Sequence, residues 1–362
     1  CMSNAPAPFV LSPILKPKVW GGRRLARFAK ALPPEGGPDA MIGESWELAD
    51  LDSTSAGGGG GEAAHSTIAT GALAGQTIRD AVRAWGGDLL GAASPTASGG
   101  FPLLVKYLDA REHLSVQVHP SPAYAAAHAD AHLKTESWYV LAAEASVLAD
   151  GTPLEPVLYK GVREGLTPDV FASLVAEGRA GEAMVAEPAV PGTCHTLPSG
   201  TLHALGAGVL VAEVQTPSDT TFRVYDWQRE YARPDRELHL ERAMRCIEWG
   251  AAPGGLSARA EDARGVVAAT PFYELCELRG HCEEKALAPI AAGRCAVLML
   301  VGGMGAELAS ASGAFEGASM GVGATAVVPA SCASDTVLRA GPGTVALVAM
   351  LGDSTRAPAA AG

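Results

Sequence analysis

Residues 114–120, LSVQVHP, constrain the fold more than any other part of the chain, because apolar and polar side chains alternate there. That alternation is typical of a strand with one buried face. Side chains two positions apart point to the same face of a strand, so Gln117 and His119 project together, with Ser115 on their side. Such a pair could begin a metal-ligand set whose other members lie on other strands. The pattern therefore favours a β protein whose strands converge on one interior.

The composition agrees with a protein of many short strands. The chain has 362 residues, including 43 glycines and 25 prolines, which suits frequent turns better than a helical bundle. Hydrophobic residues make up 48% and charged residues 18%, which is typical of a globular protein. The length suits two domains and is sufficient to bury a large core.

Charge and cysteine content bear on the partners of the protein. The net charge is −12 and no basic run is present, so we expect no nucleic-acid partner, and an anionic substrate would need a locally basic pocket. The seven cysteines are odd in number and lack a CxxC pair, which favours free thiols in a reducing compartment. We find neither a signal-peptide pattern nor an apolar run of membrane-spanning length. We therefore expect a cytoplasmic protein with no membrane partner and no obligate protein partner.

Hydrophobic periodicity predicts the main elements. Strands are expected over residues 9–18, 42–49, 101–108, 134–141 and 209–215. Helices are expected over residues 76–90 with Thr77 as the N-cap, over 121–133 and 240–249, and as an insertion near 161–186. The five glycines at 57–61 lack the Lys-Ser/Thr ending of a phosphate-binding loop, so we expect a flexible loop there.

A Pro/Gly-rich linker at residues 251–255 divides the chain in this interpretation. Residues 1–250 are expected to form a catalytic domain that contains the helical insertion. Residues 256–354 are expected to form a smaller β-sandwich of short strands, without a cluster of metal-ligand residues. The predicted fold class is therefore mainly β, in two domains.

Four residues could meet at one metal ion in such a fold: Gln117, His119, Glu136 and His203. Their nitrogen and oxygen donors suit a borderline cation such as zinc. An antiparallel barrel can bring such ligands together, with one pair on a strand and single ligands on later strands. A single histidine on a strand is more often a structural residue, so the pattern alone leaves both interpretations open.

Five segments carry a resemblance to a known family. They are FPLLVKYLDA at 101–110, LSVQVHP at 114–120, KTESWY at 134–139, GTLHA at 200–204 and the stretch 219–223. In this order, between about residues 19 and 227, they resemble class I mannose-6-phosphate isomerases. The resemblance implies two cupin-type jelly-roll β-barrel domains with a helical insertion, and one catalytic zinc ion (Zn²⁺) per chain.

The resemblance also implies roles for individual residues. The zinc ligands of the family fall on Gln117, His119, Glu136 and His203. Expected catalytic residues are Arg223, Lys134 and Glu213, and expected contacts to the phosphosugar are Lys106, Ser115, Asp219 and Trp20.

The reaction implied is the interconversion of mannose 6-phosphate and fructose 6-phosphate through an enediolate. Arg223 could stabilise the enediolate oxygen, and Lys134 or Glu213 could transfer the proton. Lys106 and Ser115, with Lys134 as a further candidate, could bind the phosphate by charge and hydrogen bonds. Two alternatives remain open, namely a non-catalytic sugar-phosphate-binding cupin and a cupin metalloenzyme with another substrate, such as an iron-dependent oxygenase.

Overall fold

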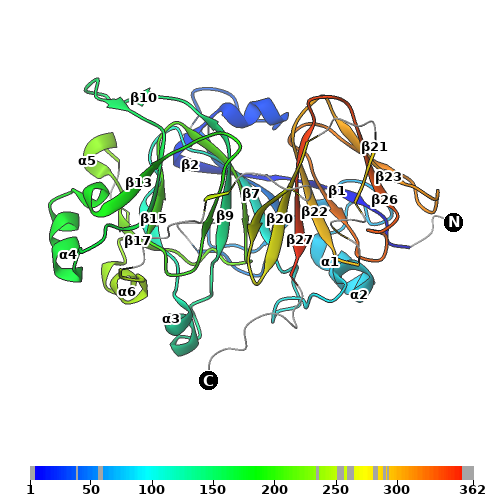
Figure 1. Ribbon diagram of the computed structural model, residues 1–362, viewed down its shortest axis with the longest axis horizontal. Coiled ribbons are helices and arrows are strands. Elements are labelled where there is room, and N and C mark those ends of the chain that lie inside the picture. Colours follow the sequence, from blue (N-terminus) through cyan, green and yellow to red (C-terminus); the bar gives the residue numbers. More distant parts are fainter. Residues whose placement is uncertain are drawn as a thin grey trace.

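Antiparallel β-sheets dominate the computed structural model of the chain (Figure 1). The structure describes residues 5–37, 40–55, 60–233, 236–250, 257–258, 265–279, 284–287, 291 and 293–352. Four larger sheets follow one another along the long axis, and helices cover one end (Figure 1). The prediction of a mainly β fold is confirmed.

The first pair of sheets encloses the candidate site. A seven-stranded sheet has the order β18 (Ser257–Ala258), β14 (Cys194–Leu197), β9 (Glu136–Ala143), β16 (Val209–Gln215), β7 (Leu104–Asp109), β3 (Ile42–Leu48), β2 (Ile14–Gly22). A five-stranded sheet has the order β13 (Met184–Pro188), β12 (Val157–Val162), β15 (His203–Leu205), β8 (Val116–Val118), β17 (Phe222–Tyr225). One buried apolar cluster joins strands of both sheets and includes Trp138, Leu158 and Val211.

The second pair contains the C-terminal strands. A seven-stranded sheet has the order β19 (Val266–Ala269), β20 (Tyr273–Arg279), β27 (Val345–Leu351), β22 (Ala296–Gly302), β25 (Thr325–Val328), β1 (Phe9–Ser12), β6 (Thr67–Ile68). A four-stranded sheet has the order β21 (Glu284–Ala286), β26 (Thr336–Ala340), β23 (Ala306–Ser310), β24 (Ala318–Met320). Leu298, Leu308 and Val348 belong to the core that these two sheets share.

Strand β16 shows how the two seven-stranded sheets are held together. Leu210 and Ala212 belong to a core that also contains residues of β20, β22 and β27. Val209 and Val211 belong to the cluster on the other face, toward the candidate site. The strand is therefore buried on both faces, which explains its nearly continuous apolar sequence. Because side chains alternate along a strand, Glu213 falls on the same face as Val211.

Helices cover the outer face of the five-stranded sheet. Side chains of α3 (Pro122–Ala127), α4 (Pro168–Ala176) and α6 (Leu240–Cys246) share a buried cluster with Val116 and Val118 of β8. The remaining short elements are η1 (Arg24–Phe28), β4 (Asp50–Leu51), β5 (Ala64–His65), α1 (Ile78–Trp85), α2 (Gly87–Leu90), β10 (Ser146–Val147), β11 (Pro153–Leu154), η2 (Ala180–Ala183) and α5 (Gln228–Tyr231). Val116 and Val118 face the helices, so the predicted alternation leaves Gln117 on the inner face.

All four predicted helices are shorter than expected, and the one expected over 240–249 ends at Cys246 as α6. The other three differ more. The segment 76–90 is split into α1 and α2 at Gly86, whose backbone has φ 47° and ψ −117°, a conformation that favours glycine. The segment 121–133 contains only α3, because the backbone is extended at His128. The insertion near 161–186 contains α4 and η2, but its two ends belong to strands β12 and β13. Alanine content and apolar spacing alone overestimated all three.

The N-terminal strand pairs with the C-terminal part of the chain. Phe9 lies opposite Val327 and Val10 opposite Ala326, while Leu11 of the same strand lies opposite Ile68. Hydrogen bonding in this sheet therefore crosses the predicted boundary between residues 250 and 256. The division into domains 1–250 and 256–354 stays a prediction.

The four C-terminal strands expected at residues 272–278, 295–301, 325–329 and 344–351 are found as β20, β22, β25 and β27, and β19, β21, β23, β24 and β26 were not predicted. The predicted linker at 251–255, most of the glycine run at 57–61 and the tail after residue 353 lie outside the described residues. The five described cysteines are buried and free, as expected, and Cys1 and Cys282 lie outside the described part.

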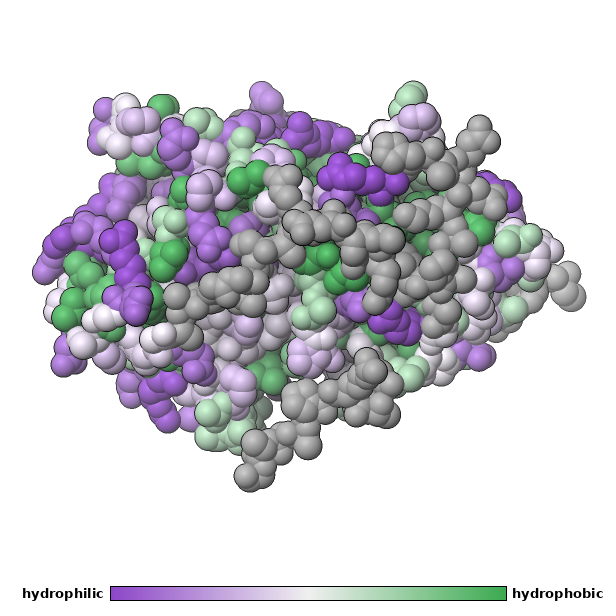
Figure 2. Space-filling model, viewed as in Figure 1, coloured by the Kyte–Doolittle hydropathy of each residue, from purple (hydrophilic) through white to green (hydrophobic). Residues whose placement is uncertain are grey.

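None of the described helices has the length and apolarity to cross a membrane. On the face in Figure 2, hydrophilic and hydrophobic residues are intermixed over the described surface.

Candidate active site

Three strands bring together a buried group of metal-ligand side chains. His119 directly follows β8, Glu136 begins β9 and His203 begins β15. Their ligand atoms all lie within 4.8 Å of one another. The three residues are between 0% and 1% exposed, so any ion that they hold would be shielded from bulk water.

Hydrogen bonds fix both imidazole rings in an orientation that suits a metal ion. His119 Nδ1 lies 3.0 Å from the carbonyl oxygen of Thr220, and His203 Nδ1 lies 2.8 Å from that of Thr201. A carbonyl oxygen only accepts, so each Nδ1 donates its proton and each neutral ring keeps a lone pair on Nε2. Carbonyl partners of this kind commonly orient histidine ligands of metals.

Glu136 is the acidic member of the group. His203 Nε2 lies 3.1 Å from Glu136 Oε1, His119 Nε2 lies 3.4 Å from Oε2, and Lys134 Nζ lies 2.7 Å from Oε2. Burial opposes ionisation of this carboxyl, but Lys134 and the two histidines outweigh it and hold its pKa well below its usual value. Burial and the nearby Lys134 lower the pKa of His119 to about 3, so this ring is neutral, as a ligand must be.

The donor set fits a zinc ion. Both oxygens of Glu136 are buried and are approached by Lys134 and by the two proposed histidine ligands. The amide nitrogen of Gln117 lies 3.2 Å from His203 Nε2, so the fourth predicted ligand borders the same group. Two imidazole nitrogens with carboxylate and amide oxygens are ligands that zinc accepts.

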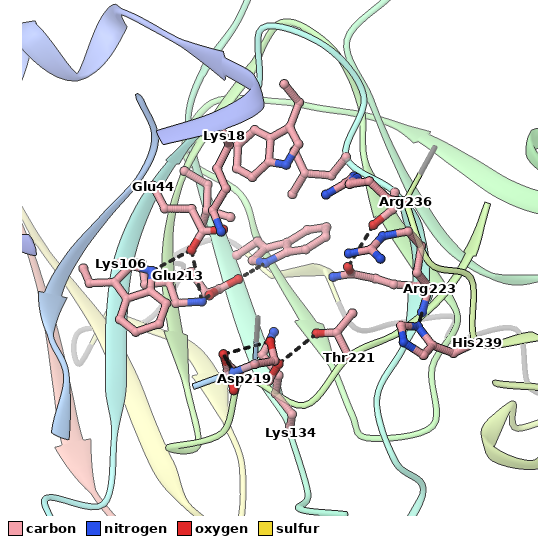
Figure 3. Close-up of a pocket in the computed structure, with 18 of the residues that line it drawn as sticks. Lys18, Glu44, Lys106, Lys134, Glu213, Asp219, Thr221, Arg223, Arg236 and His239 are labelled. Carbon is pink, nitrogen blue, oxygen red and sulfur yellow. Dashed lines mark hydrogen bonds and ion pairs between the residues drawn. The ribbon is translucent and has the colours of Figure 1, made fainter. Parts of the chain in front are cut away.

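A cavity of about 520 Å³ opens beside this group. Figure 3 shows Lys18, Glu44, Lys106 and Glu213 on one side of it. Lys106 Nζ lies 3.2 Å from Glu213 and 3.6 Å from Glu44, and Lys18 Nζ lies 3.2 Å from Glu44. Burial raises the pKa of Glu44 but Lys18 and Lys106 lower it more, to about 2. Burial likewise disfavours the charge of Lys106, yet Glu213 and Glu44 raise its pKa above the ordinary value. This side thus holds two cations and two carboxylates.

The opposite side of the cavity contains Arg223, Arg236 and His239 (Figure 3). Arg223 lies on β17 directly opposite Gln117 of β8, so its side chain starts beside a predicted metal ligand. Its Nη1 donates to the carbonyl oxygen of Glu237 at 2.7 Å, and its buried Nε makes no hydrogen bond. Arg236 donates to both carboxylate oxygens of the buried Asp226.

The structure brings all the sequence-predicted site residues into one region. Eight of them line the cavity: Trp20, Lys106, Ser115, Gln117, Lys134, Glu213, Asp219 and Arg223. His119, Glu136 and His203 form the adjoining ligand group. Asp219 Oδ2 accepts hydrogen bonds from the backbone and hydroxyl of Ser55, and Ser115 Oγ lies 3.3 Å from Gln117 Oε1.

Several cavity residues escaped the sequence analysis. They are Lys18, Glu44, Trp46, Thr221, Arg236, Glu237 and His239. Glu44 and Trp46 carried a usable signal, because they share one face of a predicted strand and a carboxylate on such a buried face needs a partner. Arg236 and His239 follow β17 in an irregular segment, where no periodicity indicates the direction of a side chain.

Comparisons with known proteins agree with this geometry. The phosphomannose isomerase type I catalytic domain matches residues 9–149. Mannose-6-phosphate isomerase ManA of Bacillus subtilis is 32% identical over 246 residues, which cover 67% of this chain and 68% of that protein. Mannose-6-phosphate isomerase of Streptococcus mutans is 32% identical over 276 residues, 74% of this chain and 77% of that protein.

Solved structures share the fold over nearly the whole chain. The mannose 6-phosphate isomerase structure from Bacillus subtilis has a TM-score of 0.74 at 24% identity and covers 95% of this chain and 99% of its own. A mannose 6-phosphate isomerase bound with zinc and yttrium has a TM-score of 0.66 at 17% identity. The match covers 95% of this chain and 99% of that chain. The cupin-type fold that the sequence predicted is thereby confirmed. On the sequence matches, this chain belongs to the type I phosphomannose isomerase family.

Proposed function

We propose that this protein interconverts mannose 6-phosphate and fructose 6-phosphate, using one zinc ion per chain held by Gln117, His119, Glu136 and His203. The observation that carries the proposal is the buried group of His119, Glu136 and His203, whose ligand atoms lie within 4.8 Å of one another. This group adjoins a cavity lined by cationic side chains. Membership of the isomerase family supplies the substrate class.

The reaction moves one proton between adjacent carbons of the open-chain sugar. A base removes the proton at C2 of the aldose, which gives an enediolate, and a proton delivered to C1 then gives the ketose. A bound zinc ion would supply Lewis-acid polarisation of the sugar oxygens. Arg223 would stabilise the negative charge of the enediolate. Its side chain starts on β17 beside Gln117, and its guanidinium stays cationic at any working pH.

Two residues are placed to move the proton. Lys134 Nζ lies 3.1 Å from His119 Nε2 and is 5% exposed at the side chain, so it borders the ligand group in a water-poor setting. Glu213 Oε2 accepts a hydrogen bond from Trp138 Nε1 at 2.8 Å, and its Oε1 lies 3.2 Å from Lys106 Nζ. Each could act as base in the proposed reaction. Lys106, Ser115, Asp219 and Trp20 would contact the sugar phosphate.

The test combines metal analysis with an isomerase assay. We expect about one zinc per chain, formation of fructose 6-phosphate from mannose 6-phosphate, loss of activity with a chelator and recovery when zinc is added. The Glu136→Gln variant, which is nearly isosteric, should lose most of its zinc and its activity together.

Other outcomes would favour the alternatives. Bound zinc without turnover of either sugar phosphate would favour a binding protein or an enzyme for another phosphosugar. Bound iron with oxygen consumption would favour a metal-dependent oxygenase. Full activity in a zinc-free protein would contradict the proposed metal requirement.

A further inference from the structure

We propose that Arg236, with His239, forms the subsite that binds the phosphate group of the substrate, on the side of the cavity opposite to Lys106. This inference rests on the proposed function and assigns a specificity-determining residue to it. It differs from the expectation drawn from the sequence, which gave the phosphate to Lys106 and Ser115, with Lys134 as a further candidate.

The lysine side of the cavity is already electrically compensated. Lys106 is 5% exposed and lies between two carboxylates, Glu213 at 3.2 Å and Glu44 at 3.6 Å. Glu44, with its pKa lowered to about 2, stays ionised at any working pH. A phosphate dianion placed there would meet Glu44 and Glu213, which lie within 4 Å of Lys106, and Glu44 also lies 3.2 Å from Lys18.

The arginine side contains a buried cation that makes no direct ion pair with any residue that the structure describes. Arg223 is 9% exposed, and the carboxylates of Asp226 and Glu237 act on it from beyond ion-pair distance. Its Nε is buried and makes no hydrogen bond. A desolvated guanidinium without an anion in direct contact is costly, which favours an anionic ligand at this part of the site.

Arg236 extends the positive charge from Arg223 toward the solvent. The two guanidiniums are close enough for Arg236, after burial, to lower the pKa of Arg223. Arg236 has a side chain 23% exposed, Arg223 is 9% exposed, and the metal-ligand group is at most 1% exposed. If the reacting carbons lie at the buried group, the far end of a six-carbon sugar lies toward the mouth, beside Arg236.

The hydrogen bonds of Arg236 fix its guanidinium and leave one of its nitrogens for a phosphate oxygen. Nε and Nη2 bind Asp226, which is fully buried and fixes the plane of the guanidinium. Nη1 has no partner among the residues that the structure describes. Arginine in this planar form is suited to phosphate oxygens.

His239 supplies a second donor on the same side. Its Nδ1 accepts the backbone N–H of Arg223 at 3.1 Å, so the neutral ring carries its proton on Nε2. Among the residues that the structure describes, Glu237 Oε2 lies 3.8 Å from that atom, and this side chain is 83% exposed to water. An N–H donor in the cavity is thereby available to a phosphate oxygen.

The test measures phosphate binding separately from chemistry. Inorganic phosphate serves as the probe, as a competitive inhibitor and in direct titration of the zinc-loaded protein. In Arg236→Gln, we expect its dissociation constant and the KM for mannose 6-phosphate to rise roughly ten- to hundredfold, while kcat changes less than about threefold. In Arg236→Lys, both constants should lie between those of the parent and those of Arg236→Gln. The lysine keeps the positive charge beside Asp226 but loses the planar set of guanidinium donors.

Matched variants make the test decisive. Arg242→Gln removes the same charge from an exposed arginine that pairs with Asp130 and does not line the cavity, so its phosphate affinity should stay unchanged. Lys106→Met removes a cation that is already paired with Glu213 and Glu44, so its effect on the affinity for inorganic phosphate should be much smaller than that of Arg236→Gln. Weakened phosphate binding in Lys106→Met with normal binding in Arg236→Gln would overturn the assignment.

Failure of the two proposals can be told apart. If phosphate binds and Arg236→Gln weakens it, but no isomerase activity is found, the subsite stands and the proposed reaction falls. If the protein is an active isomerase and Arg236→Gln and Arg236→Lys both keep the parent KM and phosphate affinity, the reaction stands and the subsite falls.

Discussion

At the scale of single residues, the site is marked by buried polar atoms without a hydrogen bond of regular geometry, although the carboxylates of Glu136 and Glu213 lie beside lysines. Among the residues that the structure describes, eight buried side-chain atoms make no hydrogen bond, and four of them belong to Glu136, Glu213 and Arg223. An unsatisfied buried polar atom costs about 1–3 kcal/mol. Concentrating this cost around one cavity is typical of a site that a metal ion and a polar substrate complete.

Replacing Arg223 separates catalysis from metal binding. We expect Arg223→Ala to keep the fold and the zinc content, because Gln117, His119, Glu136 and His203 remain. Removal of a fixed donor to a developing oxyanion should lower kcat by roughly 10²- to 10³-fold. Steady-state kinetics with metal analysis checks this, and an unchanged kcat would remove Arg223 from the mechanism.

His113 predicts a pH dependence of stability away from the metal-ligand group. Burial, helped by Arg233, lowers the pKa of His113 from 6.5 to about 4, and its Nδ1 accepts the N–H of Ala207 at 2.7 Å. The unfolded chain therefore binds more protons between these two values. The contribution to the free energy of unfolding, on the order of 3 kcal/mol, is fully present above pH 6.5 and is lost as the pH falls toward 4.

The variant His113→Asn checks this dependence, since its side-chain oxygen can still accept the Ala207 N–H without titrating. We expect its unfolding free energy, measured with urea at several pH values, to fall less steeply below pH 6.5 than that of the parent. Parallel curves for the two proteins would contradict the prediction. Other buried histidines contribute equally to both and cancel in the comparison.

At the scale of elements, capping and backbone conformation set the helix limits that apolar spacing missed. Thr77 accepts the N–H of Asp80 at 3.2 Å, and Asp80 Oδ2 accepts the N–H of Thr77 at 3.0 Å, which together form a capping box. This confirms the predicted start of the helix at 76–90. Its early end at Gly86 depends on a backbone conformation that no hydrophobic pattern indicates.

The cap gives a local prediction for helix α1. Thr77→Ala should lower the unfolding free energy by about 1 kcal/mol, because the first turn loses a side-chain acceptor. Thr77→Ser keeps the acceptor and should stay within a few tenths of a kcal/mol of the parent. Chemical denaturation checks both, and equal losses in the two variants would show that the hydroxyl does not act as a cap.

At the scale of the whole molecule, a buried ion pair links the two pairs of sheets. Lys30 Nζ lies 2.8 Å from Glu47 Oε2 of β3 and donates to the carbonyl oxygen of Gly323 at 2.9 Å. Thr325 of β25 donates to the same Glu47 oxygen at 3.3 Å. Burial raises the pKa of Glu47 in spite of the opposing Lys30, so this carboxylate depends on its partners. Together with the pairing of β1 and β25, the contacts of Lys30 with Gly323 and of Thr325 with Glu47 join chain segments roughly 280 to 320 residues apart.

Removing one member of this pair should destabilise the whole protein. We expect Lys30→Met to lower the unfolding free energy by about 3–5 kcal/mol, because Glu47 is left buried without its counter-ion. The double variant Lys30→Met/Glu47→Gln should lose less than the sum of the single variants. Urea unfolding of the four proteins tests the coupling, and strictly additive losses would contradict it.

Some features of the candidate site are encoded in short stretches of sequence, and others depend on the pairing of distant strands. Alternation along one strand put Gln117 and His119 on a common inner face, and the motifs around Glu136, His203 and Arg223 identified the family, because both are properties of short stretches of chain. The meeting of these residues depends on strand pairing, such as Arg223 opposite Gln117 and His203 opposite the same residue. The pairing of distant strands depends on how the whole core is buried, and a local sequence pattern does not specify this.

The same reason explains what escaped prediction elsewhere. Compensation of Lys106 by Glu44 and Glu213 requires three neighbouring strands to be placed side by side, and Arg236 reaches the cavity from an irregular segment held by Asp226. A charge that looks available in a sequence can be neutralised by a residue far away in the chain. For this protein, local sequence therefore specified the chemistry of the site, while long-range packing set which charges remain available to a substrate.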